Sequence, residues 1–166
     1  MTSAAACLLA LLASPAAAPA VAEEALPLPR FVSLKADEVN LRAGPGETYP
    51  VEWVYTRKGL PVEVIAEYDQ WRKVRDVEGT VGWVHRVMLS GQRSVIVTGA
   101  AVRTAFDAPS ADGDAVFRAE PGVQAVLIGC EPGWCRVDVS GTKGWMPMAE
   151  LWGVYPEDGG GEGEGG

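Results

Sequence analysis

The sequence contains little of the chemistry that most enzyme active sites need. Its 166 residues include one histidine, His85, and three cysteines. A catalytic zinc site takes three protein ligands, and a serine nucleophile needs a histidine beside it, often after a G-x-S-x-G turn that this chain lacks. We therefore predict no catalytic residue, no metal and no cofactor, and we expect that the protein is not an enzyme. A pair of carboxylates brought together by folding stays open, because the chain has 22 Asp and Glu residues.

An excess of basic residues is also missing. The formal net charge is −8, from 14 Lys and Arg against 22 Asp and Glu. Residues 31–93 hold as many basic as acidic side chains, whereas residues 94–156 and 157–166 are acidic on balance. Because no segment forms a basic stripe, nucleic acid and anionic membrane surfaces are poor candidates for a partner.

The two ends of the chain do not show the patterning of a folded domain. Residues 1–22 hold an apolar run at 7–13 and small residues up to Ala20-Val21-Ala22, the pattern of a cleaved secretory signal. We predict export to the periplasm or the extracellular space, with no integral membrane span after cleavage, because the run is too short to cross a bilayer. A retained membrane anchor is the alternative. Residues 156–166 are acidic and glycine-rich, and we predict that they form a disordered tail.

An internal repeat organises the remaining residues into two units of about 60 residues each. Within a unit, apolar and polar residues alternate with a period of two, and Gly and Pro turns separate the short runs. We predict an all-β protein of two tandem barrels at residues 31–90 and 94–155, which a linker of a few residues holds in a fixed relation. The matched segments are 39–42 with 100–103, 58–65 with 121–128, 71–74 with 134–137, and 82–84 with 144–146.

The first unit resembles the bacterial SH3-like domain in the order and spacing of its motifs, which include VNLRAGPG at 39–46, WRKV at 71–74 and GWVH at 82–85. The second unit resembles a diverged copy, in which residues 103–109 have lost the Arg-Ala-Gly-Pro turn. Domains of this family are commonly appended to cell-wall hydrolases, where they hold peptidoglycan or its peptide stems. The resemblance therefore implies two small β-barrels and an envelope-binding role.

Glycine and tryptophan recur at equivalent places in the two units. Gly82 and Gly144 each precede a Trp in a strand-like run, which predicts a bulge or a close backbone approach. The Gly44-Pro45-Gly46 segment predicts a tight reversal with glycine at positive φ. Positions kept between drifted copies serve the shared fold, so we predict that the recurring tryptophans fill the small cores. These are Trp71, Trp83, Trp134 and Trp145.

Cys130 and Cys135 flank a Pro-Gly turn signature. If that turn joins two strands, the cysteines oppose each other with Cβ atoms about 4.5–5.5 Å apart, close enough for a disulfide after modest adjustment. In an oxidising compartment we predict that they are bridged, and the small ring adds only about 2 kcal/mol of stability. A metal or redox pair is the alternative, but the histidine that could assist it belongs to the other unit.

The aromatic residues around the Gly-Pro-Gly turn are the candidates for ligand contact. Trp53 and Tyr55 alternate onto one face of a predicted strand, and rigid aromatics are common at recognition surfaces. We predict that they line a groove beside the turn, or alternatively that they pack against the second barrel. The predicted ligand-binding residues are Arg42, Tyr49, Trp53, Tyr55 and His85.

Two functions remain open for the tandem. The first is a binding module for peptidoglycan or its peptide stems. The second is an adaptor for an envelope protein, which would use an exposed strand edge or the aromatic face. Residues 152–155, which follow the second unit, are predicted to seal the junction between the barrels.

Overall fold

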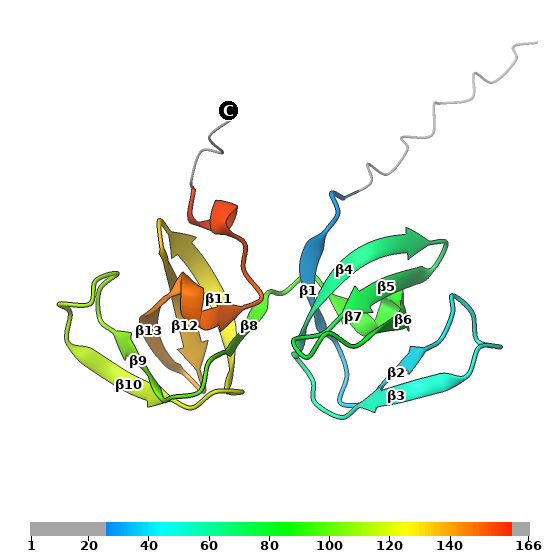
Figure 1. Ribbon diagram of the computed structural model, residues 1–166, viewed down its shortest axis with the longest axis horizontal. Helices are drawn as coiled ribbons and strands as arrows, with labels where there is room; N and C mark the ends of the chain where they lie inside the picture. The colour runs from blue at the N-terminus through cyan, green and yellow to red at the C-terminus, as the bar shows by residue number, and fades with distance from the viewer. Residues whose placement is uncertain (1–25, 161–166) are drawn as a thin grey trace, which may run out of the picture.

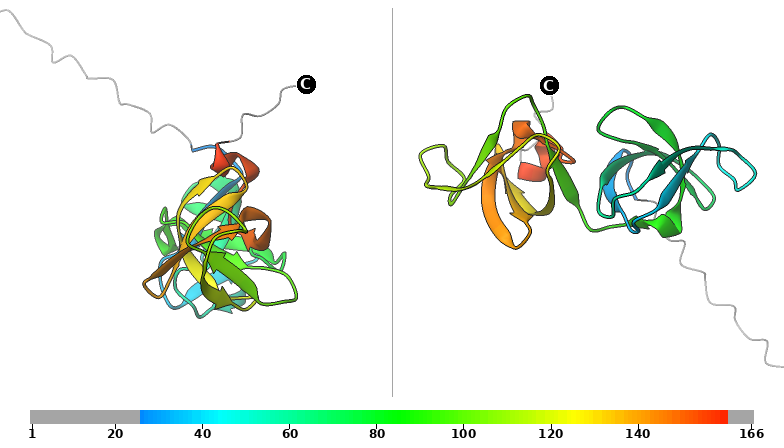
Figure 2. Two further views of the ribbon diagram at one scale, coloured as in Figure 1. Left: turned by 90° about the vertical axis from the view of Figure 1, so that its left-hand side faces the viewer. Right: turned by 90° about the horizontal axis from the view of Figure 1, so that it is seen from below.

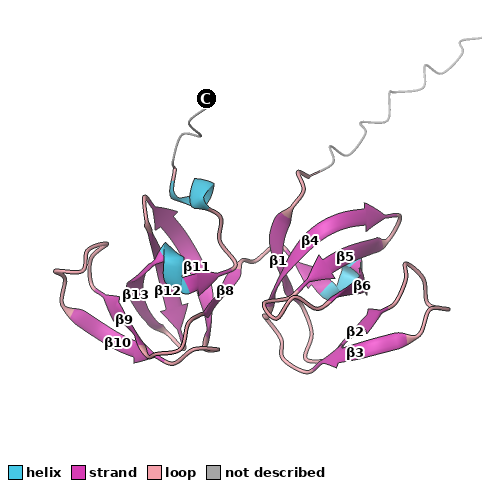
Figure 3. Ribbon diagram, viewed as in Figure 1, coloured by secondary structure: helices cyan, strands magenta, loops and turns pink. Residues whose placement is uncertain are grey.

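The structure is a computed structural model, and it describes residues 26–160. The predicted signal peptide at residues 1–22 and the tail beyond residue 160 lie outside the described residues. The described chain folds into two β-barrels that lie side by side, joined by a short segment before β8 (Ser94–Val97) (Figures 1 and 2). Strands dominate, and the helices between them are short 3-10 turns (Figure 3), so the predicted all-β tandem is confirmed.

Each barrel is a seven-stranded sheet, the strand pairs of the described residues are antiparallel, and both sheets have the same strand order. That order is β3-β2-β6-β5-β4-β1-β7 in the first barrel and β10-β9-β13-β12-β11-β8-β14 in the second. The first barrel comprises β1 (Arg30–Leu34), β2 (Val39–Arg42), β3 (Val51–Tyr55), β4 (Pro61–Tyr68), β5 (Trp71–Arg75), β6 (Val81–His85), η1 (Arg86–Met88) and β7 (Leu89–Ser90). The second comprises β8, β9 (Arg103–Phe106), β10 (Ala115–Ala119), β11 (Gln124–Glu131), β12 (Trp134–Val139), β13 (Thr142–Pro147), η2 (Met148–Glu150) and β14 (Leu151–Trp152), and η3 (Pro156–Gly159) follows it.

The structure corrects the alignment of the repeat at its start. Arg42 pairs with Trp83 between β2 and β6, and Phe106 pairs with Trp145 between β9 and β13. Phe106 therefore takes the place of Arg42, whereas the sequence alignment placed Arg103 there. The alignment was displaced because residues 98–102 form a bend before β9, although the apolar residues at 100–102 resemble the start of a strand.

The two described core clusters are built mainly from small and aliphatic side chains, with Tyr55 in the first, and neither cluster includes a tryptophan. Val62, Val74 and Val84 are fully buried in the first core, and Met146 is fully buried in the second. The prediction that the four recurring tryptophans fill the cores is wrong for Trp83, Trp134 and Trp145, which are only half-buried, whereas Trp71 is buried as predicted. In β6 the residues beside Trp83 point inward, so alternation turns the indole to the outer face of the barrel.

The recurring glycines permit the close packing that was predicted for them. A Cβ atom on Gly82 would lie 2.5 Å from the Cγ of Leu41, and one on Gly144 would lie 2.8 Å from the Cβ of Ala105. These distances are too short for any side chain. Each glycine therefore lets β2 or β9 cross directly over the neighbouring strand.

The segment after the second barrel fastens the two barrels together, as predicted for residues 152–155. The ring of Phe31 in β1 lies 4.9 Å from that of Trp152 and 4.6 Å from that of Tyr155. The Tyr155 hydroxyl donates a hydrogen bond of 2.8 Å to Oε1 of Glu63, which is only 5% exposed. Two further hydrogen bonds cross the junction, from Ser94 Oγ and the Gln124 side chain to carbonyl oxygens of the first barrel.

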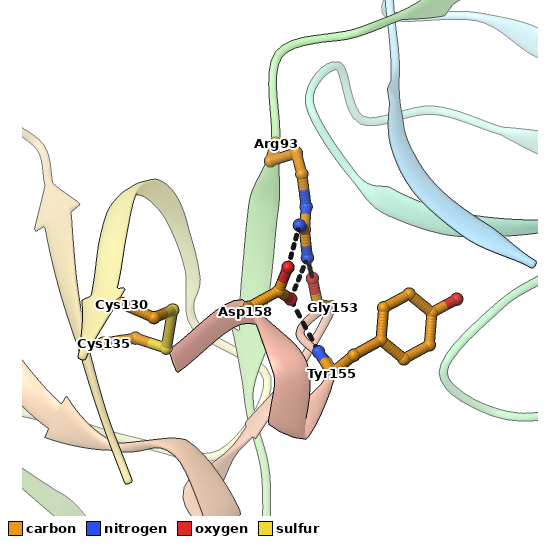
Figure 4. The surroundings of a disulfide bond; sticks show 6 residues. All are labelled: Arg93, Cys130, Cys135, Gly153, Tyr155 and Asp158. Carbon is orange, nitrogen blue, oxygen red and sulfur yellow. Dashed lines mark hydrogen bonds and ion pairs between the residues drawn. A yellow bond between two sulfur atoms is a disulfide. The ribbon is translucent and has the colours of Figure 1, made fainter. Parts of the chain in front are cut away.

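Arg93, in the linker, ties this segment to the barrels (Figure 4). Its guanidinium donates to both carboxylate oxygens of Asp158 at 2.8 Å and to the Gly153 carbonyl oxygen at 2.6 Å. Its Cζ also lies 5.8 Å from the centre of the Phe31 ring. The hydrogen bond from Arg93 is the main reason that the pKa of Asp158 lies below its usual value. We call Arg93, Asp158 and Tyr155 the clasp.

The prediction that disorder begins at residue 156 is wrong for the first residues of the tail. Pro156–Gly159 form η3, and the Asp158 carboxylate accepts a hydrogen bond from the backbone N–H of Tyr155 at 2.7 Å. Polar contacts order this segment, and the composition of the tail, which lacks apolar residues, gave no sign of them. Beside η3, Cys130 and Cys135 form a disulfide across β11 and β12, with Cα atoms 4.0 Å apart (Figure 4).

Candidate functional site

A pocket of about 350 Å³ opens where the first barrel faces the second. Its wall on the first barrel comes from β3, the start of β4 and the turn between β5 and β6, and the second barrel adds Ile96 and Gly122. Pockets that bind small ligands are mostly apolar with a few placed polar groups, and this lining has that character. The first barrel contributes Trp53, Val54, Tyr55, Thr56, Arg57, Leu60, Pro61, Val62, Asp76, Val77 and Glu78.

The strand register explains why Trp53 and Tyr55 share this pocket. They pair with Leu41 and Val39 of β2, both core residues, so both side chains lie on the inner face of β3. Tyr55 lies over the core and is 6% exposed, whereas Trp53 is nearer the end of the ribbon and is 55% exposed. The sequence left open whether these two residues line a groove or face the second barrel. Both descriptions apply, because the second barrel closes the groove that they line.

Tyr55 lines the pocket and is also part of the scaffold beneath it, and its contact with a ligand stays a prediction. Its hydroxyl donates to Oδ2 of Asp76 at 2.9 Å. Burial, and then this hydrogen bond, raise the pKa of Tyr55 above its usual range. Oδ1 of Asp76 accepts hydrogen bonds from the N–H groups of Glu78 and Thr80 at 3.0 and 2.8 Å. The carboxylate thus fixes both the tyrosine and the turn between β5 and β6.

The remaining polar groups of the pocket are free to meet a ligand. Arg57 and Glu78 are both exposed and supply charges of opposite sign at its edge. The indole of Trp53 offers a flat, rigid face beside them. This arrangement suits a ligand with an apolar face and several hydrogen-bonding groups, such as a sugar or a short peptide.

Arg42 and Tyr49 were predicted to line the same groove, but they are not among the residues that line this pocket. Nη1 of Arg42 donates to the carbonyl oxygens of Glu47 and Tyr49 at 3.1 and 2.8 Å, so the guanidinium braces the loop after β2. The Tyr49 ring packs over Gly44, where a Cβ atom would collide with it, and remains 46% exposed.

The glycines of this loop do not adopt the predicted positive φ. Neither Gly44 nor Gly46 is among the residues with positive φ. A glycine is needed at position 44 because the tyrosine ring occupies the space of a side chain. Steric room, and not backbone conformation, therefore accounts for this part of the motif.

His85 also lies away from the pocket. Its ring packs edge-to-face against Trp71, with centroids 5.2 Å apart, and its Nδ1 accepts a hydrogen bond from the N–H of Val87 at 3.4 Å. These contacts cover Trp71 and cap η1. The five predicted ligand-binding residues thus fall into three places. Trp53 and Tyr55 line the pocket, Arg42 and Tyr49 share the loop after β2, and His85 lies apart.

The second barrel keeps the loop that follows its second strand, at residues 107–114, although the Arg-Ala-Gly-Pro sequence of the first barrel is missing there. Asp107 N–H bonds to the Asp114 carbonyl at 3.0 Å, as Ala43 N–H does to Pro50 at 3.0 Å. By this register Ala108 replaces Gly44, and Gly113 replaces Tyr49. Ala108 has a side chain where Gly44 has none, and Gly113 lacks the ring of Tyr49 that would collide with it. The second barrel therefore keeps the loop backbone but has no exposed aromatic side chain there.

Sequence reasoning missed two residues that shape this region. Asp76 follows a strand without any motif of its own, and Glu63 falls in an alternating pattern that predicts exposure. The structure buries Glu63 at the junction because Arg75 and Tyr155 both bond to it. A charged residue in the middle of a valine-rich strand was the available signal.

Residues 26–160 contain no group of three or more His, Cys, Asp or Glu side chains placed to hold a metal ion. Within the same residues, no helix has the length and apolar character needed to cross a membrane.

Comparison with known proteins gives a family and a distant relative. The family model of the bacterial SH3 domain matches residues 35–91 and 100–153. A Bacillus subtilis (strain 168) protein named "Putative N-acetylmuramoyl-L-alanine amidase YrvJ" is 23% identical over 125 residues, which are 68% of this chain and 24% of that protein. The chain therefore spans about a quarter of the length of this curated relative.

Two solved structures that resemble parts of this chain are an NlpC1 protein and an NlpC/P60 family protein. NlpC1 from Trichomonas vaginalis is 12% identical, with a TM-score of 0.35, over 78% of this chain and 47% of that one. An NlpC/P60 family protein from Bacillus cereus ATCC 10987 is 14% identical, with a TM-score of 0.33, over 74% of this chain and 55% of that one.

Proposed function

Because the chain belongs to the bacterial SH3 domain family, we propose that it is a non-catalytic binding module of the cell envelope that recognises peptidoglycan or its peptide stems. The observation that carries this proposal is the pocket between the barrels, walled by the exposed indole of Trp53. The name of the Bacillus subtilis relative describes an amidase of N-acetylmuramoyl-L-alanine, in which an amide bond joins a cell-wall sugar to an amino acid. A domain shared with such a protein is suited to holding the same polymer.

The pocket fits a repeating polymer of sugars and short peptides. An indole face can cover the apolar side of a sugar ring or an alanine methyl group, while Arg57 and Glu78 at the edge can bond to carboxylate, amine or amide groups. The fixed junction supports this role. A wall made by two barrels keeps its shape only if the barrels do not swing, and the clasp holds them.

Export to the periplasm or the extracellular space is part of the proposal. The disulfide between Cys130 and Cys135 supports it, because such bonds persist mainly in oxidising compartments. Fractionation of cells that express the full chain tests it, and a protein found only in the cytoplasm, with Cys130 and Cys135 as free thiols, would count against export.

A second candidate function is an adaptor for an envelope protein. It is favoured by β3, which is the outermost strand in the order of its sheet and exposes Val51, Trp53 and Val54. An edge strand of this kind can accept a further strand from a partner. Crosslinking in cells that gives one discrete protein adduct at β3 would favour the adaptor.

The direct test is retention on purified sacculi. We expect the wild-type protein to be retained, Trp53→Ala to be retained poorly, and Tyr68→Ala to behave as wild type, because Tyr68 is equally exposed but lies outside the pocket. No soluble wall fragments should be released. Failure of the wild type to bind, or equal retention of both variants, would reject the site, and released fragments would show an enzyme.

A further inference from the structure

A second pocket, on the first barrel alone, is basic although the chain as a whole is acidic. Its volume is about 400 Å³, and its lining residues come from β1, β4, β5, η1 and β7, from the residues that follow β1 and β7, and from Leu26 before β1. It has no lining residue in common with the pocket between the barrels. None of the residues that line it is acidic, and its four cations are Arg30, Lys35, Arg72 and Arg86. They come from separate segments of the sequence, so they do not form a basic stripe that could be recognised in it.

One carboxylate neutralises part of this charge. Oε1 of Glu67 lies 3.0 Å from Nε of Arg72 and is also bonded to Arg30. Among residues 26–160, Lys35 and Arg86 have no carboxylate within ion-pair distance, and Arg86 donates instead to the neutral amide oxygen of Gln70. The pocket therefore keeps a surplus of positive charge.

The two inner arginines are already held in place. The side chains of Arg30 and Arg72 are only 20% and 16% exposed, and Nη1 of Arg72 donates to the carbonyl oxygens of Asp69 and Trp71 at 2.9 and 3.0 Å. Nη1 of Arg30 is buried without an acceptor. Groups fixed before binding lose little entropy when a ligand arrives, so this cluster is preorganised.

We propose that this pocket binds the C-terminal carboxylate of a peptide whose last residue has a small apolar side chain. Arginine and lysine recognise carboxylate and phosphate oxygens through charge-assisted hydrogen bonds. Lys35 and Arg86, which have no carboxylate of their own, receive the anion. The aliphatic surface made by Val32, Val87 and Leu89 takes the apolar group, and a bare phosphate would leave that surface uncovered. This inference does not depend on the proposed function.

The test is an NMR titration of the isotope-labelled full chain with N-acetyl-alanyl-alanine and with its C-terminal amide. We expect saturable amide shifts along β1, β5 and η1 with the free acid, weaker binding at high salt, and no binding of the amide. The Lys35→Gln/Arg86→Gln double variant should bind roughly fivefold more weakly, since an exposed ion pair contributes a factor of about two to five.

The matched control is Arg118→Gln/Lys143→Gln, which removes the same charge from exposed positions of the second barrel. If both double variants bound the peptide equally weakly, net charge alone would explain the loss, and the proposed site would be overturned. Equal binding of the amide, or tighter binding of inorganic phosphate at the same residues, would also overturn it. Trp53→Ala should leave this titration unchanged, which separates its outcome from that of the sacculus experiment.

Discussion

The clasp makes a prediction about stability that can be worked from its contacts. Arg93→Met keeps an apolar side chain of similar length but removes the bonds to Asp158 and to the Gly153 carbonyl, together with the guanidinium over the Phe31 ring. Hydrogen bonds to charged groups contribute about 1.5–3 kcal/mol each, and they are not additive within one network. The two side chains are 28% and 21% exposed, so water partly screens the pair. We expect the free energy of unfolding to fall by about 2–3 kcal/mol.

The effect should depend on pH in a defined direction. The pKa of Asp158 is lower in the folded protein than its usual value, so this contribution is fully present above about pH 4 and is lost as the pH falls through the folded-state pKa. Urea unfolding, followed by tryptophan fluorescence, should therefore show a large gap between wild type and Arg93→Met at pH 7 and a smaller gap near pH 2. Arg118→Met, at an exposed position, is the control. Equal midpoints at pH 7, or a gap that does not shrink in acid, would refute the role of the clasp.

Three further predictions concern single features. Tyr155→Phe leaves Oε1 of the buried Glu63 without its donor and should cost about 1–2 kcal/mol in urea unfolding, unlike a change confined to the surface. Gly82→Ala should lower stability by about 1–3 kcal/mol through overpacking, measured by calorimetry, whereas Gly91→Ala, with open space around it, should not. Thiol titration of the unreduced, signal-cleaved protein should find no free cysteine, and reduction should cost about 2 kcal/mol; two titratable thiols would contradict the disulfide.

The sequence predicts the architecture because the relevant signals are local. The period of two, the Gly and Pro turns and the repeat each depend on neighbouring residues, and the disulfide follows from a short turn. The outward position of Trp83 could have been predicted from neighbouring residues. Gly82 must face inward to let Leu41 pass, and alternation then places Trp83 outside.

The parts that could not be predicted depend on contacts between distant segments. One side of the pocket is closed by Ile96 and Gly122 of the second barrel, which reach it because the clasp fixes the barrels together. The pairing of Arg93 with Asp158 joins residues at opposite ends of the second unit, and neither residue carries a motif. Composition alone therefore assigned Asp158 to a disordered tail.

Equilibrium binding to purified sacculi tests the central claim most directly. Labelled protein should bind saturably, soluble stem peptide or glycan fragments should compete, and Trp53→Ala should weaken binding at least about fivefold, since an aromatic contact and its buried area contribute about 1 kcal/mol or more. Absence of saturable binding by the wild type, or an unchanged isotherm for Trp53→Ala beside the Tyr68→Ala control, would contradict the account.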